Sequence, residues 1–196
     1  MANKSKLDRR AVIKTLMEPR GDALLVTGLG SSCYDAGTLD HPNNFYLWGG
    51  MGGAAMIGVG LALAQPKRRV LVVTGDGEML MGLGSLATIA AEKVKNLSIV
   101  VIDNELYSET GMQPTHTARG VDLAGMAAAA GFAVTGTVSN DAELKTWVPK
   151  VYGAPGPLFL DIKVNANRYP LSIRLRDGAH IKNRFREALL GAKAFD

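Results

Sequence analysis

The stretch that decides the fold runs Arg69-Val-Leu-Val-Val-Thr-Gly-Asp-Gly77, and 26 residues separate it from Asn104. Its apolar, β-branched first part predicts a buried parallel strand, and the segment 78–93 after it predicts a helix. A second apolar run at 97–102 brings the chain back as another strand, which ends just before Asn104. Because open α/β sheets bind ligands at the carboxyl ends of their strands, Asp76 and Asn104 are expected to share one site.

The chemistry of these two side chains suits a magnesium ion bound to a phosphate. Mg²⁺ takes few oxygen ligands from a protein and completes its octahedron with phosphate oxygens and water. Gly75 and Gly77 allow the backbone to approach a diphosphate closely, and the following helix offers the anion its N-terminus. An Asp here could also be an ordinary helix cap and the Asn an ordinary turn residue, but their matching positions favour the metal site.

This pattern resembles the fingerprint of enzymes that use thiamine diphosphate (ThDP), in which Gly-Asp-Gly precedes an Asn at this spacing. Gly49-Gly-Met-Gly-Gly-Ala54 resembles the loop that holds the aminopyrimidine ring of the cofactor. The phrases Gly82 to Ala90 and Gly111 to Thr115 resemble the small subunit of sulfopyruvate and phosphonopyruvate decarboxylases. The resemblance covers residues 24–164 and implies the diphosphate-binding domain of this family.

The resemblance also implies roles for individual residues. Asp76 and Asn104 would bind Mg²⁺ through side-chain oxygens, and the backbone carbonyl of Leu106 would be the third protein ligand. Met51 would support the cofactor in its V shape, with a core residue at a helix start as the less favoured alternative. The carbonyl of Gly49 would accept a hydrogen bond from the 4′-amino group. The remaining expected cofactor contacts are Gly75, Gly77 and Glu78.

Two positions depart from the family pattern. Leu106 stands where the family often has Gly, but a carbonyl ligand depends on the backbone rather than on the side chain. Glu78 stands where a small residue is frequent. A carboxylate is favourable at a helix N-terminus but competes with a neighbouring diphosphate. We therefore expect Glu78 to point away from the phosphates toward a basic residue of a partner chain, with a plain first-turn glutamate as the alternative.

The segment 105–120 is polar and irregular, and it predicts a mobile loop without regular structure. Such a loop could close over bound substrate and exclude water. His116 lies within it. Closure would bring His116 near the reacting carbon as a catalytic proton donor or anion contact. A solvated surface histidine is the alternative.

The rest of the chain alternates strands with helices, which predicts one α/β domain over residues 1–196 with a mostly parallel sheet and helices on both faces. Helices are expected at 6–17 with Ser5 as N-cap, 28–37, 51–64, 122–130, 141–152 and 179–190, and further strands at 23–27, 44–48, 133–138 and 157–164. From about residue 165 the chain becomes a basic tail. Its Arg174 and Arg176 could reach an anionic substrate, but a salt-bridged surface is the more ordinary interpretation.

Composition narrows the function classes. The chain is 47% hydrophobic and 20% charged, which is typical of globular proteins. The net charge of +4 is modest and its basic residues are not interleaved with aromatics, so no nucleic acid is expected. The single Cys33 is compatible with a reducing compartment. The charged N-terminus does not resemble a signal peptide, and the apolar run 51–64 is too short to span a bilayer. We expect a cytoplasmic protein.

The resemblance implies a reaction in which the ThDP ylid adds to a 2-oxo acid, CO₂ leaves and protonation releases an aldehyde. In the family, the glutamate that assists ylid formation belongs to a separate pyrimidine-binding domain. This chain contains only the diphosphate-binding domain, so a partner α subunit is expected to supply that glutamate. The favoured hypothesis is the β subunit of a two-chain decarboxylase for a small anionic 2-oxo acid such as sulfopyruvate or phosphonopyruvate.

Other functions remain open. The chain could be the ThDP subunit of a 2-oxo acid oxidoreductase or a carboligase, or a non-catalytic binding subunit. Such oxidoreductases commonly carry an iron–sulfur cluster, which needs several cysteines. The single cysteine of this chain argues against that alternative. The presence of Asp76, Asn104 and Met51 argues against a non-catalytic subunit. A dinucleotide-binding domain is excluded because Gly28-Leu-Gly30 lacks the third glycine at Cys33.

Overall fold

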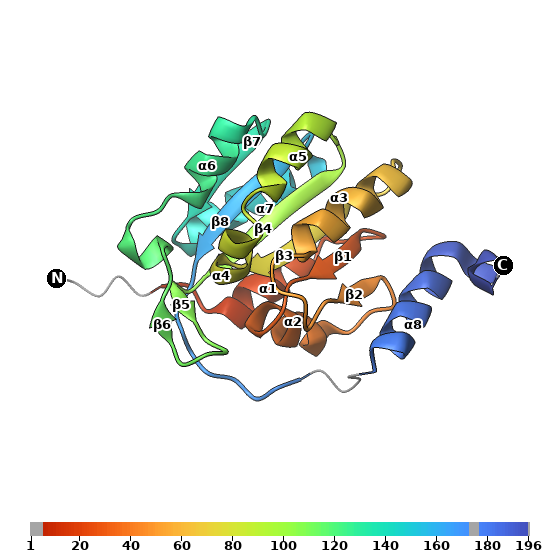
Figure 1. Ribbon diagram of the computed structural model, residues 1–196, viewed down its shortest axis with the longest axis horizontal. Helices are drawn as coiled ribbons and strands as arrows, with labels where there is room; N and C mark the ends of the chain where they lie inside the picture. Colours follow the sequence, from red (N-terminus) through yellow and green to blue (C-terminus); the bar gives the residue numbers. More distant parts are fainter. Residues whose placement is uncertain (1–5, 173–176, 196) are drawn as a thin grey trace.

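A six-stranded, fully parallel sheet forms the centre of the molecule (Figure 1). The computed structural model describes residues 6–172 and 177–195. The strands lie in the order β2-β1-β3-β4-β8-β7, and every neighbouring pair is parallel. The expected α/β class is therefore confirmed. The strands of this sheet are β1 (Leu24–Thr27), β2 (Asn44–Tyr46), β3 (Val70–Gly75), β4 (Leu97–Asp103), β7 (Val134–Val138) and β8 (Leu158–Lys163).

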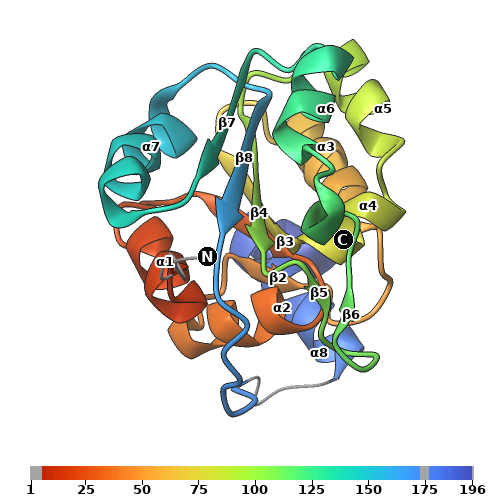
Figure 2. The same ribbon diagram turned by 90° about the vertical axis from the view of Figure 1, so that its left-hand side faces the viewer.

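Helices cover both faces of the sheet (Figure 2): α1, α2 and α7 pack on one face, and α3, α5 and α6 on the other. Their bounds are α1 (Arg9–Met17), α2 (Ser31–Ala36), α3 (Ala54–Ala64), α5 (Ser85–Glu92), α6 (Leu123–Ala130) and α7 (Asp141–Gly153). A short 3-10 helix, η1 (Gly37–Leu39), follows α2. Along β3, Leu71 and Val73 face the first layer whereas Val70 and Val72 face the second, as the alternation of strand side chains requires.

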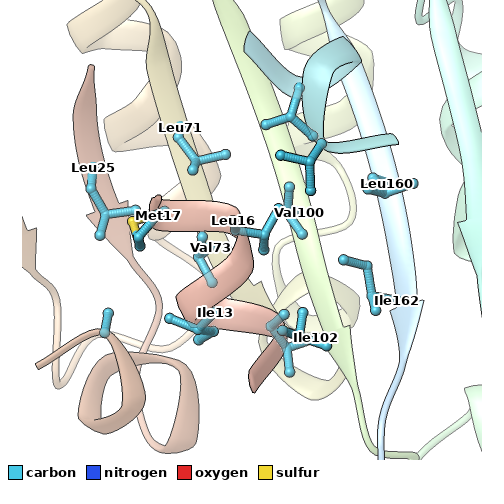
Figure 3. Packing of buried hydrophobic residues seen from close by; sticks show 14 of the residues in the cluster. Ile13, Leu16, Met17, Leu25, Leu71, Val73, Val100, Ile102, Leu160 and Ile162 are labelled. Atoms are coloured by element: carbon cyan, nitrogen blue, oxygen red, sulfur yellow. The ribbon is translucent and has the colours of Figure 1, made fainter. Parts of the chain in front are cut away.

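The first hydrophobic layer fixes the position of α1. Figure 3 shows Ile13, Leu16 and Met17 of this helix over the strands, against side chains such as Val73 and Val100. Leu16 and Val100 are completely buried. This packing fixes α1 against the sheet. The position of its first residue, Arg9, is therefore defined as well.

The helix α1 begins later than predicted. Its N-cap is Asp8, whose side chain accepts a hydrogen bond from the backbone N–H of Ala11 at 2.9 Å. The expected cap, Ser5, lies outside the described residues. Just before the cap, Leu7 pairs with Val164, which follows β8. The start of α1 is thereby tied to the carboxyl edge of the sheet.

The single helix predicted at 78–93 is wrong, because two helices occupy this segment. They are α4 (Asp76–Met81) and α5, separated by the turn Gly82-Leu-Gly84. A Cβ atom on Gly82 would lie 2.4 Å from the backbone oxygen of Gly52. The chain turns where its backbone touches the loop before α3, and only glycine permits that approach.

The segment 105–120 has more structure than predicted. It forms a two-stranded hairpin of β5 (Leu106–Tyr107) and β6 (Gln113–Pro114), followed by the 3-10 helix η2 (Thr117–Arg119). Thr115 and Thr117 are buried. The expectation of an irregular segment is therefore wrong, since its polar residues find buried hydrogen-bond partners. Whether the hairpin closes over a substrate stays a prediction.

The basic tail ends in the predicted helix, α8 (Gly178–Leu190), followed by the 3-10 helix η3 (Gly191–Phe195). The ring of Phe185 meets that of Phe45 on β2 edge to face, with centroids 5.5 Å apart. Arg184 donates two hydrogen bonds to the Asp40 carboxylate, at 2.8 and 3.0 Å. These contacts hold α8 beside β2, the strand at the edge of the sheet.

Arg174 and Arg176, which were considered for contact with an anionic substrate, lie outside the described residues. Within the described ranges, none of the helices combines the length and the apolar character that crossing a bilayer requires.

Candidate functional site

A cavity of about 260 Å³ lies at the carboxyl ends of β1, β3 and β4. This is the edge at which open α/β sheets bind ligands. The hairpin β5–β6 and the loop before α3 provide the rest of its wall. The wall contains most of the predicted cofactor contacts: Met51, Gly75, Asp76, Gly77, Glu78, Asn104 and Leu106.

Asp76 is the buried acidic group of this cavity. It is 2% exposed, and its Oδ2 accepts a hydrogen bond from the hydroxyl of Thr115 at 2.5 Å, while the hydroxyl oxygen of Thr117 lies 3.3 Å from the same atom. Burial, and then the nearby charge of Asp103, raise the pKa of Asp76 to about 6. None of the ion pairs found among the described residues involves Asp76. A bound cation would supply the missing counter-charge.

Asn104 follows β4 and forms a tight turn at the cavity wall. Its side-chain oxygen accepts a hydrogen bond from the N–H of Leu106 at 2.9 Å, and its amide donates to the hydroxyl of Ser108 at 2.8 Å. This turn keeps the Asn104 oxygen next to the backbone of Leu106. The described residues contain no group of three or more His, Cys, Asp or Glu side chains that could hold a metal. Of the three residues predicted as magnesium ligands, all of which line the cavity, Asp76 has the carboxylate, and Asn104 and Leu106 are neutral.

Glu78 was predicted to point toward a basic residue of a partner chain, but its partners in the structure lie within this chain. Glu78 is 5% exposed, and its carboxylate accepts hydrogen bonds from the N–H of Leu29 at 3.0 Å, the N–H of Ala54 at 3.2 Å and the hydroxyl of Thr74 at 2.7 Å. Burial raises its pKa, and these three donors oppose the shift. A Cβ on Gly28 would lie 1.7 Å from Glu78 Oε2. Glu78 therefore joins the two loops that flank the cavity.

The other predicted catalytic residues occupy different places. Met51 lines the cavity close to Gly77. A Cβ on Gly77 would lie 3.6 Å from the Met51 methyl group. Gly49 is exposed and is not part of the described wall. His116 is also exposed, immediately before η2, and is likewise absent from that wall. Its catalytic role stays a prediction.

A polar network lies beneath the cavity floor. The hydroxyl of Thr117 donates to Asp103 Oδ1 at 2.9 Å, and Lys163 pairs with Oδ2 of the same carboxylate. Lys163 also lies 2.9 Å from Asp161, whose pKa is raised to about 7 by burial and then by the charge of Asp103. Two hydroxyls thus link the predicted metal ligand Asp76 to a second buried carboxylate, and one lysine partly neutralises this negative region.

Sequence reasoning missed several residues of the cavity. Ser31 and Ser32, at the start of α2, line it. The Tyr107 ring also lines it and covers Gly77, where a Cβ would lie 2.5 Å from the ring. The turn Gly28-Leu-Gly-Ser-Ser32 was visible as a helix entrance, and its position after β1 was the signal that could have placed both serines at the same edge as Asp76.

Comparison with known proteins agrees with this geometry. The model of the family described as "Thiamine pyrophosphate enzyme, C-terminal TPP binding domain" matches residues 28–162. The chain belongs to this family. The match begins directly after β1 and contains β3, β4 and the loops that form the cavity, so the ThDP-type fingerprint identified in the sequence lies in its expected structural context.

The relatives include proteins of similar length. The chain is 35% identical over 187 residues to sulfopyruvate decarboxylase subunit beta of Methanothermobacter thermautotrophicus, covering 95% of this chain and 97% of the relative. It is 32% identical to the protein of the same name from Methanococcus maripaludis, covering 94% and 98%. Phosphonopyruvate decarboxylase of Streptomyces viridochromogenes is 37% identical, but the match covers 79% of this chain and only 38% of that protein.

A solved structure supports the fold. Benzoylformate decarboxylase from Polynucleobacter necessarius superposes with a TM-score of 0.70 at 24% identity. The superposition covers 84% of this chain and 34% of that one. The chain therefore spans almost the whole of the two beta subunits named above and about a third of the benzoylformate decarboxylase chain.

Proposed function

We propose that this chain is the ThDP- and Mg²⁺-binding subunit of a two-chain enzyme that decarboxylates a small anionic 2-oxo acid, such as sulfopyruvate or phosphonopyruvate, to an aldehyde. The observation that carries the proposal is the single cavity wall shared by Met51, Asp76 and Asn104. Its substrate class is supported by the two beta-subunit relatives, which match this chain over nearly their whole length.

The residues present fit a magnesium diphosphate. The two threonine hydroxyls occupy Oδ2 of Asp76, so its Oδ1 would face the cation. Asn104 Oδ1 and the Leu106 carbonyl would be the neutral ligands, a set of hard oxygen donors that suits Mg²⁺. The buried Asp76 has no ion-pair partner among the described residues, which the cation would provide. Gly75 leaves the wall open, since a Cβ there would meet nothing within 4 Å.

Bound ThDP would supply the electron sink for decarboxylation, and the protein would bind and orient it. Met51 would support the folded cofactor from one side of the cavity, with the carbonyl of Gly49 as the expected acceptor for its amino group. Glu78 would act indirectly by fixing Leu29 and Ala54, which hold the flanking loops in place. His116 would contribute a proton only if the hairpin moves, because the residue is exposed in this structure.

A partner subunit is inferred from the glutamates that this domain does and does not contribute to the cavity. In the wall of the cavity, the two glutamates among the described residues are Glu78, which is held by three donors, and Glu109 on the hairpin. Neither occupies the pyrimidine-binding domain in which this family keeps its activating glutamate. We therefore assign that group to a partner α subunit, with the cofactor lying across the interface.

The test is a decarboxylation assay with this chain co-expressed with a pyrimidine-domain subunit. Sulfopyruvate, phosphonopyruvate and pyruvate, which lacks the sulfonate or phosphonate group, are supplied with ThDP and Mg²⁺, and aldehyde formation is measured. We expect turnover of an anionic substrate only with both chains, and its loss when a chelator removes Mg²⁺. Full turnover by this chain alone would refute the two-chain proposal, and a ThDP-loaded complex inactive on both sulfopyruvate and phosphonopyruvate would refute the substrate class.

A further inference from the structure

A buried arginine in the cavity has no role in the function proposed above. Arg9, the first residue of α1, is 6% exposed and lines the cavity. Among the described residues of the wall, it is the only one with a positive charge. Packing of α1 under the sheet and pairing of Leu7 with Val164 hold it there. Arginine is rarely buried unless its charge is paired, so the partners of Arg9 decide its role.

Its pairing within the chain is incomplete. Arg9 Nε lies 3.0 Å from Asp35 Oδ2, but neither atom has a partner with hydrogen-bond geometry. Arg10 uses the same carboxylate better, because its Nε donates to Asp35 Oδ1 at 2.7 Å. Two guanidinium groups thus share one carboxylate, which leaves a net positive charge. Both guanidinium groups also stack on Tyr169, with distances to the ring centroid of 5.2 Å for Arg9 and 4.5 Å for Arg10.

The hydrogen bonds of the Arg9 guanidinium group are the second observation. Among residues 6–172 and 177–195, no hydrogen bond is donated by Arg9. A guanidinium presents several donors in a rigid fork that matches the oxygens of phosphate-like groups. Ser31 and Ser32 add hydroxyls to the same wall. An anion with several oxygens would complete the charge of the Arg9–Asp35–Arg10 cluster and satisfy these donors.

We propose that Arg9 binds the tetrahedral oxyanion group of a ligand in this cavity. This inference rests on the proposed function, which provides two sources for such a group. One is the diphosphate of the cofactor, and the other is the sulfonate or phosphonate group of the substrate. In the second case Arg9 would determine specificity for 2-oxo acids that carry a sulfonate or phosphonate group over those, such as pyruvate, that lack one.

The experiment compares Arg9→Gln and Arg9→Lys in the co-expressed complex, with Arg10→Gln as matched control. Arg10 contacts the same Asp35 and Tyr169 but does not line the cavity. Calorimetry gives the Kd of ThDP at saturating Mg²⁺, and steady-state kinetics gives kcat/KM for sulfopyruvate and for pyruvate. Arg9→Gln should weaken binding of the oxyanion about tenfold to hundredfold, the range expected for the loss of one or two charge-assisted hydrogen bonds. Arg9→Lys should fall between it and wild type.

The two sources give different results. A higher Kd for ThDP with an unchanged preference for sulfopyruvate over pyruvate assigns Arg9 to the diphosphate. An unchanged Kd with a lost preference assigns it to the substrate. Both values within twofold of wild type, or an equal effect from Arg10→Gln, would overturn the inference. Should Arg9→Gln fail to fold, Arg9→Lys decides on the same criteria. A wild-type complex that neither binds ThDP nor decarboxylates would instead refute the proposed function.

Discussion

Replacing Glu78 with alanine separates two interpretations of this residue. A plain first-turn glutamate would contribute about 0.3–1 kcal/mol through the helix dipole. In the structure, however, its carboxylate is the buried acceptor for the N–H groups of Leu29 and Ala54. Leaving a buried donor without an acceptor costs about 1–3 kcal/mol, so two donors give about 2–6 kcal/mol. The hydroxyl of Thr74 can rotate to another acceptor and is left out of this sum.

The assay is urea unfolding of the full chain, followed by tryptophan fluorescence. Glu92→Ala is the matched control, because Glu92 ends α5 in an exposed position. We expect Glu78→Ala to lower the free energy of unfolding by about 2–6 kcal/mol and the control to change it little. ThDP affinity of the assembled complex should fall as well, because Leu29 lines the cavity. A loss in Glu78→Ala no larger than in Glu92→Ala would refute the interpretation.

The effect of Glu78→Ala on the free energy of unfolding should depend on pH. Burial raises the pKa of Glu78 above its ordinary value of 4.5. The folded state therefore holds this proton more tightly than the unfolded state does. The resulting contribution to stability is fully present below pH 4.5 and is lost as the pH rises through the folded-state pKa. The difference in unfolding free energy between wild type and Glu78→Ala should shrink from pH 5 to pH 8; a difference that grows would contradict this sign.

Three further predictions concern the site and its surroundings. Asp76→Ala should abolish Mg²⁺-dependent ThDP binding of the assembled complex without unfolding the chain, and Asn104→Ala should weaken binding less because a neutral ligand is lost; calorimetry showing unchanged affinity would remove either from the metal site. The Cys33 thiol is buried and its pKa is raised to about 12 by burial, so a thiol reagent at pH 8 should react with it only after denaturation; rapid labelling of the native chain would contradict this. The hairpin segment 105–120 should gain protection from hydrogen exchange when ThDP, Mg²⁺ and partner bind, and His116→Ala should then lower kcat more than cofactor affinity; equal protection in all states would exclude closure.

The sequence was sufficient for the sheet and for the centre of the site, because both depend on local pattern. The apolar run of β3 and its polar end placed Asp76 at the correct edge, and the following strand placed Asn104 beside it. These placements need only the rule that parallel strands present their carboxyl ends together. The capped helix α6 was predicted equally well, since Asp122 and Gly131 are local signals.

What the sequence could not predict are contacts between distant segments. Glu78 was expected to contact a partner chain because nothing in its sequence neighbourhood shows that the N–H groups of Leu29 and Ala54 converge on it. The segment 105–120 was considered irregular because its polar residues had nothing local to bury against. Thr115 finds its partner 39 positions away in Asp76. Arg9 was counted only as part of a basic N-terminus, and its burial depends on how α1 packs.

The attachment of α8 has a consequence for the integrity of the sheet. Within the part of the chain that the structure describes, β2 has one neighbouring strand, so its other side carries backbone groups that could pair with a foreign chain. The contact of Phe185 with Phe45 and the pairing of Arg184 with Asp40 place a helix beside this strand. By lying there, α8 would hinder strand addition and aggregation at this edge. A chain shortened before Gly178 would keep the whole cavity and lose this protection, so the cost of truncation would be measured in solubility rather than in cofactor binding.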